Sequence, residues 1–161
     1  MRGSLAEYIV GFALGVDMES PREDWAIWDL TTRDGLKVEV KSAAYLQAWY
    51  HKADSKIGFN VSKRRGWDPQ TGIEETIPSR HADVYVFAPL AHEEKATANP
   101  LNTNQWQFWV GPTSRLNTRK RSQKSISPAS LRRELGEPGA PNEGLTWPEL
   151  REHVERAVRK K

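Results

Sequence analysis

The stretch that decides the fold is Trp28-Asp-Leu-Thr-Thr-Arg-Asp-Gly-Leu-Lys-Val-Glu-Val-Lys41. Its second half alternates apolar and charged residues, which is typical of a strand with one buried face. Its first half is rich in strand-forming residues, and turn-forming residues separate the two halves. The stretch therefore predicts a β-hairpin. Because successive side chains of a strand point to opposite faces, Glu39 and Lys41 share one face of it.

The length of the turn decides which residue lies opposite Glu39. A two-residue turn at Asp34-Gly35 would pair Asp29 with Val40, whereas a three-residue turn that also includes Arg33 pairs Asp29 with Glu39. The longer turn needs a residue in the left-handed conformation at its third place, which Gly35 can adopt. The sequence allows both registers, and we favour the second because it also gathers apolar side chains on the opposite face. Those side chains are Trp28, Leu30, Val38 and Val40.

The favoured register brings two carboxylates together beside a lysine. Two carboxylates within about 5 Å of each other repel unless a positive charge neutralises them. Oxygen ligands suit Mg²⁺ or Mn²⁺, which would polarise a phosphoryl oxygen and lower the pKa of a bound water. Lys41 could orient that water or steady a phosphate, so the pattern suits phosphodiester hydrolysis. The same spacing also fits an ordinary exposed hairpin face with cross-strand Lys–Glu pairs.

The distribution of charge is more informative than its total. The 161-residue chain has 24 basic and 21 acidic residues, a net charge of +3. Residues 113–133 hold seven basic residues and no acidic one, and a second basic cluster spans residues 52–65. Such clusters predict a polyanion partner, although solvated loops would have the same composition. The expected nucleic-acid-binding residues are Lys52, Lys63, Arg64, Arg65, Arg115, Arg119, Lys120, Arg121 and Lys124.

Local signals outside the hairpin predict a single α/β domain over residues 1–161 with a mixed sheet. We expect a first helix over residues 5–14, with a Ser4–Glu7 capping box and Gly15 as its C-cap. Strands are expected near residues 56–61, 81–88 and 105–110, and residues 63–79 are loop-like. Residues 113–161 are expected to form a basic loop followed by C-terminal helices, the first opening at Ser127-Pro128 and the last beginning with a Thr146–Glu149 capping box. Trp106 and Trp109 should pack in the interior, as should Trp67, while Trp147 should pin the start of the last helix and Arg80 should be solvated.

Composition also excludes several classes of protein. The absence of cysteine excludes a disulfide scaffold and thiolate metal sites, and it is consistent with a reducing cytoplasm. No apolar run approaches about 20 residues, so no membrane partner is expected. The chain has no Gly-rich phosphate loop and no histidine spacing typical of a zinc site.

The order of these elements resembles a known family. A helix carrying Glu7, a strand with Asp29, then Glu39-Val40-Lys41 on the next strand resembles the PD-(D/E)xK nuclease superfamily, which has the restriction-endonuclease-like fold. The resemblance covers Leu5 to about Gln47 and extends through the later strands toward Leu116. Trp28 stands where the family motif carries proline before the aspartate.

The resemblance implies a Mg²⁺- or Mn²⁺-dependent endonuclease with a restriction-endonuclease-like mixed sheet flanked by helices. It implies metal ligation by Asp29, Glu39 and the Val40 carbonyl, with Lys41 as the catalytic lysine. It further implies that Glu7 supports a second metal or a water, and that Gln47 is a supporting catalytic residue. DNA is the favoured substrate, and the cytoplasm is the expected location. Whether the protein forms a homodimer is left undecided. The alternative is a non-catalytic nucleic-acid-binding module that uses the same fold.

Overall fold

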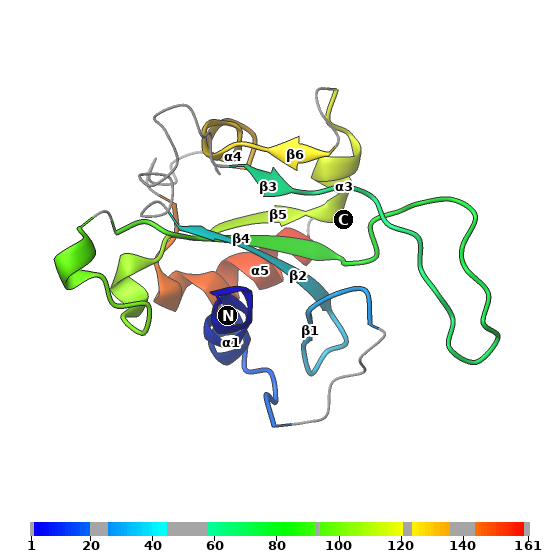
Figure 1. Cartoon of the computed structure of the whole chain (residues 1–161), viewed down its shortest axis with the longest axis horizontal. Coiled ribbons are helices and arrows are strands. Elements are labelled where there is room, and N and C mark those ends of the chain that lie inside the picture. The colour runs from blue at the N-terminus through cyan, green and yellow to red at the C-terminus, as the bar shows by residue number, and fades with distance from the viewer. Residues whose placement is uncertain are drawn as a thin grey trace.

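The computed structural model describes residues 2–19, 26–44, 58–92, 94–120, 124–135 and 144–159. Its helices and strands are shown in Figure 1. In chain order they are α1 (Arg2–Ala13), β1 (Leu30–Thr31), β2 (Lys37–Ala44), β3 (Phe59–Asn60), β4 (Val84–Leu90), the 3-10 helices η1 (Lys95–Thr97) and η2 (Thr103–Gln105), β5 (Trp109–Pro112), α3 (Thr113–Asn117), β6 (Ser125–Ile126), α4 (Pro128–Glu134), the 3-10 helix η3 (Trp147–Glu149) and α5 (Leu150–Arg159).

A four-stranded mixed sheet forms the centre of the molecule, which confirms the predicted α/β class. Its strand order is β1-β2-β4-β5. The central strands β2 and β4 are parallel, and the outer strands run antiparallel to their neighbours. A parallel pair needs a long connection, and here that connection contains β3 and the segment that leads into β4.

The hairpin has the favoured register. Leu30 pairs with Val38 and Thr31 with Lys37, so the turn contains three residues. Gly35 adopts the left-handed conformation with φ +82°. The Thr32 N–H donates to the Leu36 carbonyl at 3.0 Å, which closes the turn.

Two apolar clusters cover the two faces of the sheet. One face carries Val38 and Val40 of β2 and packs against α1 and α5. The other carries Tyr85 and Phe87 of β4 and packs under β3, β6, α3 and α4. Figure 1 shows α1 and α5 below the sheet and the β3–β6 pair above it. Trp106 and Trp109 are buried as expected, one in each cluster.

Several local predictions are confirmed and others are wrong. The Thr146–Glu149 capping box is present and α5 ends at Arg159. Gly15 ends α1 with φ +69°, and the Val16 N–H donates to the Gly11 carbonyl. However, α1 begins at Arg2, so Ser4 lies inside the helix and is not its N-cap.

Two larger expectations need correction. Trp28 packs against the cluster around Tyr85 and Phe87, not beside Leu30, and its ring lies under the Lys37 ammonium at 4.4 Å. The segment before Ser127 is not simply a basic loop, because it contains α3 and β6, while the helix expected to open at Ser127-Pro128 is present as α4. Arg115, Arg132 and Arg133 lie on these helices, whereas Arg119, Lys120 and Lys124 lie in the connections between the elements.

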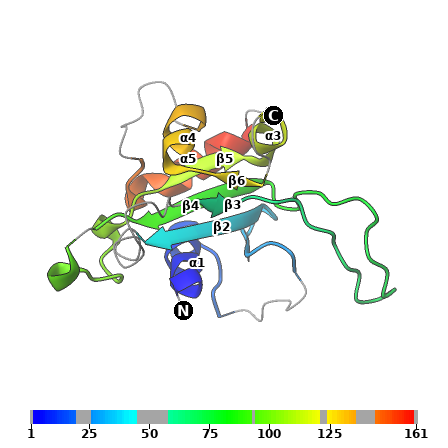
Figure 2. The same cartoon turned by 45° about the horizontal axis from the view of Figure 1, so that its top comes forward.

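Residues 64–79 form an extension that we call the arm. Backbone bridges join Arg64 to Ser79 and Trp67 to Glu74, so the arm is a loosely paired ribbon. It stands away from the sheet in both views (Figure 1 and Figure 2). Trp67, Ile73 and Ile77 are exposed on it, which makes the expected interior role of Trp67 wrong. Among the described residues, no helix is long and apolar enough to cross a membrane.

Candidate metal centre

Glu39 is the centre of the candidate site because it is a buried carboxylate with two cations on one oxygen. It lies on β2 beside Tyr85 of β4 and is only 3% exposed. The Lys41 ammonium donates to Glu39 Oε1 at 2.7 Å. Arg64 Nη2 donates to the same oxygen at 2.8 Å from the base of the arm. A buried acid held in this way is a candidate functional group.

Asp29 approaches the same strand from its edge. Its Oδ2 accepts a hydrogen bond from the Val40 N–H at 2.7 Å. The N–H and C=O groups of one strand residue point to the same side, so the Val40 carbonyl also faces the Asp29 edge of β2. Leu30 is the first residue of β1, and it pairs with Val38 of β2. Beyond that pair, the Asp29 carboxylate accepts the hydrogen bond of the next β2 N–H on this edge, that of Val40. The expected partners Asp29, Glu39 and Val40 thus come from adjacent positions of one hairpin.

Electrostatics link these groups. Burial raises the pKa of Glu39 above its ordinary value, and the nearby Asp29 carboxylate raises it further, while Lys41 and Arg64 act against that shift. Burial, together with the Glu39 charge, raises the pKa of the Tyr85 hydroxyl to about 12. Tyr85 is therefore a neutral hydroxyl at neutral pH, beside the carboxylate pair.

The donor set suits a hard divalent cation. It offers two carboxylates and one backbone carbonyl, all oxygen, which is the ligand class preferred by Mg²⁺ and Mn²⁺. The Asp29 and Glu39 carboxylates repel each other, and a bound cation would reduce that repulsion. The described residues contain no group of three or more acids or histidines able to hold a metal. A cation here would complete its coordination with the carbonyl and water.

The other predicted catalytic residues are placed differently. Glu7 is half-buried on α1, and α1 packs on the Val38–Val40 face of the sheet, on the other side from the Glu39 carboxylate. Its supporting role therefore stays a prediction without a geometric basis. Gln47 lies outside the described residues, as do Lys52 and Arg121.

The fold brings the two basic clusters together. β3 pairs with β6, and the Val61 N–H donates to the Lys124 carbonyl at 2.8 Å. Lys124 therefore lies close to the segment that holds Lys63, Arg64 and Arg65, although some 60 residues separate them in sequence. The exposed basic side chains among the predicted residues are Lys63, Arg64, Arg65, Arg115, Lys120 and Lys124.

Arg119 does not belong to this exposed group. Its Nε lies 2.7 Å from Glu134 Oε2, and its side chain is only 9% exposed. Its Nη1 donates to the Ser125 carbonyl at 2.9 Å. Arg119 therefore joins α3 to β6 and α4, and its expected contact with nucleic acid is corrected to a structural role.

Sequence reasoning missed the positions of Arg64, Tyr85 and Arg80. Arg64 was expected on a nucleic-acid surface, but no local signal pairs it with Glu39, 25 residues away. Tyr85 stands in an apolar strand, where only the pairing of β4 with β2 reveals its neighbour. Arg80 is buried, contrary to expectation, and donates to the Val61 carbonyl at 2.8 Å and to Asn117 Oδ1 at 2.7 Å.

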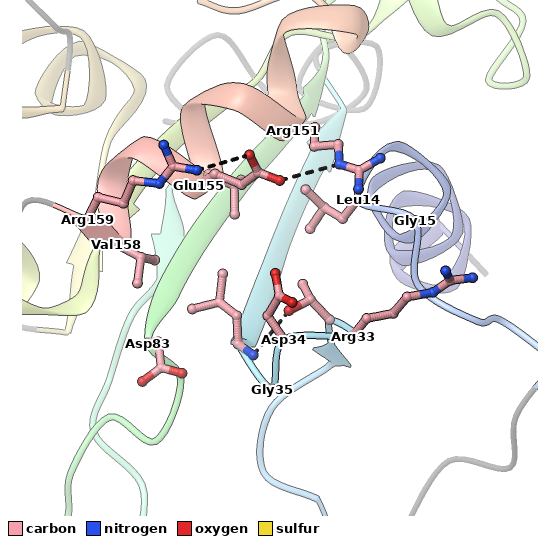
Figure 3. A pocket seen from close by; sticks show the side chains of 13 residues that line it. Leu14, Gly15, Arg33, Asp34, Gly35, Asp83, Arg151, Glu155, Val158 and Arg159 are labelled. Carbon is pink, nitrogen blue, oxygen red and sulfur yellow. Dashed lines mark hydrogen bonds and ion pairs between the residues drawn. The ribbon is translucent and has the colours of Figure 1, made fainter.

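A separate open pocket of about 700 Å³ lies between the hairpin turn, the end of α1 and α5. Figure 3 shows Glu155 between Arg151 and Arg159, with Arg33 and Asp34 across the opening. Apolar side chains of the α1–α5 face line the pocket, and Asp29, Glu39 and Lys41 do not. The pocket is thus distinct from the candidate metal centre.

A comparison with models of protein families finds none that matches this chain, and a search of curated proteins finds no match to its sequence.

Proposed function

We propose that the protein is a divalent-metal-dependent nuclease of the PD-(D/E)xK type, with DNA as its substrate. The observation that carries the proposal is the buried Glu39, which stands beside Asp29 and holds the Lys41 ammonium at 2.7 Å. The four predicted site positions on the hairpin, Asp29, Glu39, Val40 and Lys41, thus lie side by side. The same proposal includes a restriction-endonuclease-like fold and a location in the cytoplasm.

Each residue has a defined task in this proposal. Asp29, Glu39 and the Val40 carbonyl would hold Mg²⁺ or Mn²⁺. Such an ion, when bound, polarises a phosphoryl oxygen and lowers the pKa of a water. The Lys41 ammonium, which already contacts Glu39, would orient the attacking water or steady the phosphate through its N–H donors. The exposed basic side chains near Lys63 and Lys124 would hold the backbone of the nucleic acid without reading its sequence.

The decisive experiment is cleavage of supercoiled plasmid DNA with Mg²⁺ or Mn²⁺, compared with the same reaction in EDTA. Lys41→Ala should slow cleavage by about 100-fold or more, the size of a lost donor that stabilises charge in the transition state. The matched control is Lys37→Ala, because Lys37 lies on the same strand and face but contacts Trp28. Cleavage by the control should stay within about threefold of the original protein. The enzyme claim fails if no DNA or RNA is cut, or if both variants behave alike.

A second candidate function is a nucleic-acid-binding module without catalysis. It is favoured by the double neutralisation of Glu39 by Lys41 and Arg64, which satisfies the buried charge without a metal. Such a module would bind DNA with an affinity that falls steeply with salt and would show no metal-dependent cleavage. Measuring binding and cleavage on the same preparation distinguishes the two functions.

A further inference from the structure

Arg64 connects the arm to the candidate metal centre. Its Nη2 donates to Glu39 Oε1 at 2.8 Å and to the Ile27 carbonyl at 3.2 Å. Its backbone exchanges two hydrogen bonds with Ser79, at 2.9 and 3.0 Å, which close the base of the arm. The backbone is therefore fixed by the arm, while the guanidinium reaches across to the hairpin.

The Lys41 and Arg64 side chains differ in how easily each can move away from Glu39. Lys41 is on the same strand as Glu39, and its side chain is 24% exposed. Arg64 comes from a different segment, and its side chain is 54% exposed. Because the Arg64 side chain is already about half exposed, its guanidinium can turn toward water without movement of its backbone.

A divalent cation on Glu39 and the Arg64 guanidinium would compete for the same oxygen. Both are positive, and charges of the same sign a few ångströms apart in a partly buried site repel strongly. The guanidinium is also a good ligand for phosphate. The exposed side chains next to it, Lys63 and Arg65, belong to the surface that would meet the nucleic-acid backbone.

We propose that Arg64 is a counter-ion that a metal displaces: it holds Glu39 in the metal-free protein and turns to the phosphate backbone when a divalent cation binds. This inference rests on the proposed function and adds a coupling between its two ligands. Metal binding releases a phosphate-binding group, and phosphate binding removes a competitor of the metal. Each ligand therefore strengthens the binding of the other by the same factor, as thermodynamic linkage requires.

The first test measures Mn²⁺ binding in the absence of nucleic acid, by the electron paramagnetic resonance signal of free Mn²⁺. Arg64→Gln removes the competitor and should lower the Mn²⁺ Kd by about tenfold. The matched control Arg65→Gln makes the same change of charge one residue away and should alter the Kd by less than about twofold. Arg64→Lys retains a competing cation and should stay closer to the original protein than Arg64→Gln does.

The second test measures binding of a fluorescent DNA oligonucleotide with phosphorothioate linkages, which resist hydrolysis, in EDTA and in Mn²⁺. Arg65→Gln should weaken DNA binding by a similar factor under both conditions. Arg64→Gln should weaken it little in EDTA, where Glu39 holds the guanidinium, and severalfold more in Mn²⁺. Circular dichroism of each variant checks that it is folded.

The outcomes separate this inference from the proposed function. If the original protein binds Mn²⁺ but Arg64→Gln binds it equally or more weakly, Arg64 does not compete with the metal and the inference is wrong, while the nuclease proposal stands. If neither Mn²⁺ nor Mg²⁺ binds the original protein or Arg64→Gln, the metal centre itself is wrong and both proposals fall.

Discussion

Replacing Arg119 with alanine tests whether this arginine belongs to the fold or to a nucleic-acid surface. Arg119 and the neighbouring Lys120 are indistinguishable in a basic segment, but only Arg119 is buried against Glu134. Two unit charges 2.7 Å apart attract by about 6 kcal/mol at an effective dielectric constant of about 20. Most of this attraction offsets the desolvation of the two groups, so it is an upper limit.

The expected loss of stability is smaller than that limit. Removing one partner of a buried pair costs about 3–5 kcal/mol, because the other charge is left without a partner. The Glu134 side chain is 29% exposed, so water can recover part of that cost. We therefore expect Arg119→Ala to lower the free energy of unfolding by about 2–3 kcal/mol. For a chain of this length, that corresponds to a fall in Tm of about 5–10 °C.

The assay is thermal and urea unfolding followed by circular dichroism, with Lys120→Ala as the matched control. The control should leave Tm within about 1 °C and weaken DNA binding instead. The double variant Arg119→Met with Glu134→Leu removes both charges and should recover part of the loss. A Tm for Arg119→Ala within 1 °C of the original protein would refute the structural role assigned to this side chain.

Two further predictions concern the candidate site and its turn. Tyr85 should ionise near pH 12, later than an ordinary tyrosine, so an ultraviolet titration should show a late step that Tyr85→Phe lacks. Because the folded state holds this proton longer than the unfolded state, stability should fall as pH rises from 10 toward 12, and a single step near pH 10 for all tyrosines would contradict the assigned environment. Gly35→Ala should cost about 1 kcal/mol through strain at φ +82° alone, since nothing within 4 Å would meet the added methyl group. Unfolding in urea measures this cost, and an unchanged midpoint would show that the turn relaxes without cost.

Local sequence signals predicted the parts of the structure that depend on local physics. The hairpin has one of the two registers that the sequence allows, and the longer turn is favoured because Gly35 can adopt the left-handed conformation found there, with φ +82°. The Thr146–Glu149 capping box follows from hydrogen bonds three residues apart. These interactions are complete within a few residues, so local sequence patterns can indicate them.

The features that prediction missed depend on contacts between distant segments. Arg119 and Lys120 have the same local environment in sequence, and only the packing of α3 against α4 distinguishes them. Arg80 is buried where it donates to the Val61 carbonyl, just after β3, and to Asn117 Oδ1 at the end of α3. In a regular strand Trp28 and Leu30 would lie on the same face, but here they pack on opposite faces of the sheet. The Asp29 N–H, between them, donates to the Val38 carbonyl at 3.0 Å. For the candidate site, the sequence predicted the carboxylates and Lys41 but not the position of Arg64 or the role of Tyr85.

The parallel pairing of β2 with β4 has a consequence for the order in which the protein folds. The Lys37 N–H donates to Asp83 across 46 residues of chain, so this pair forms only after a long loop has closed. The β1–β2 hairpin needs no such closure and brings Asp29 and Glu39 together by local contacts. During synthesis the ribosome releases the two acids before Arg64 and Tyr85, so the early hairpin contains Glu39 with only Lys41 as its counter-charge. We expect the isolated hairpin to be weakly structured for this reason, and the acidic site to become stable only when the parallel strand arrives.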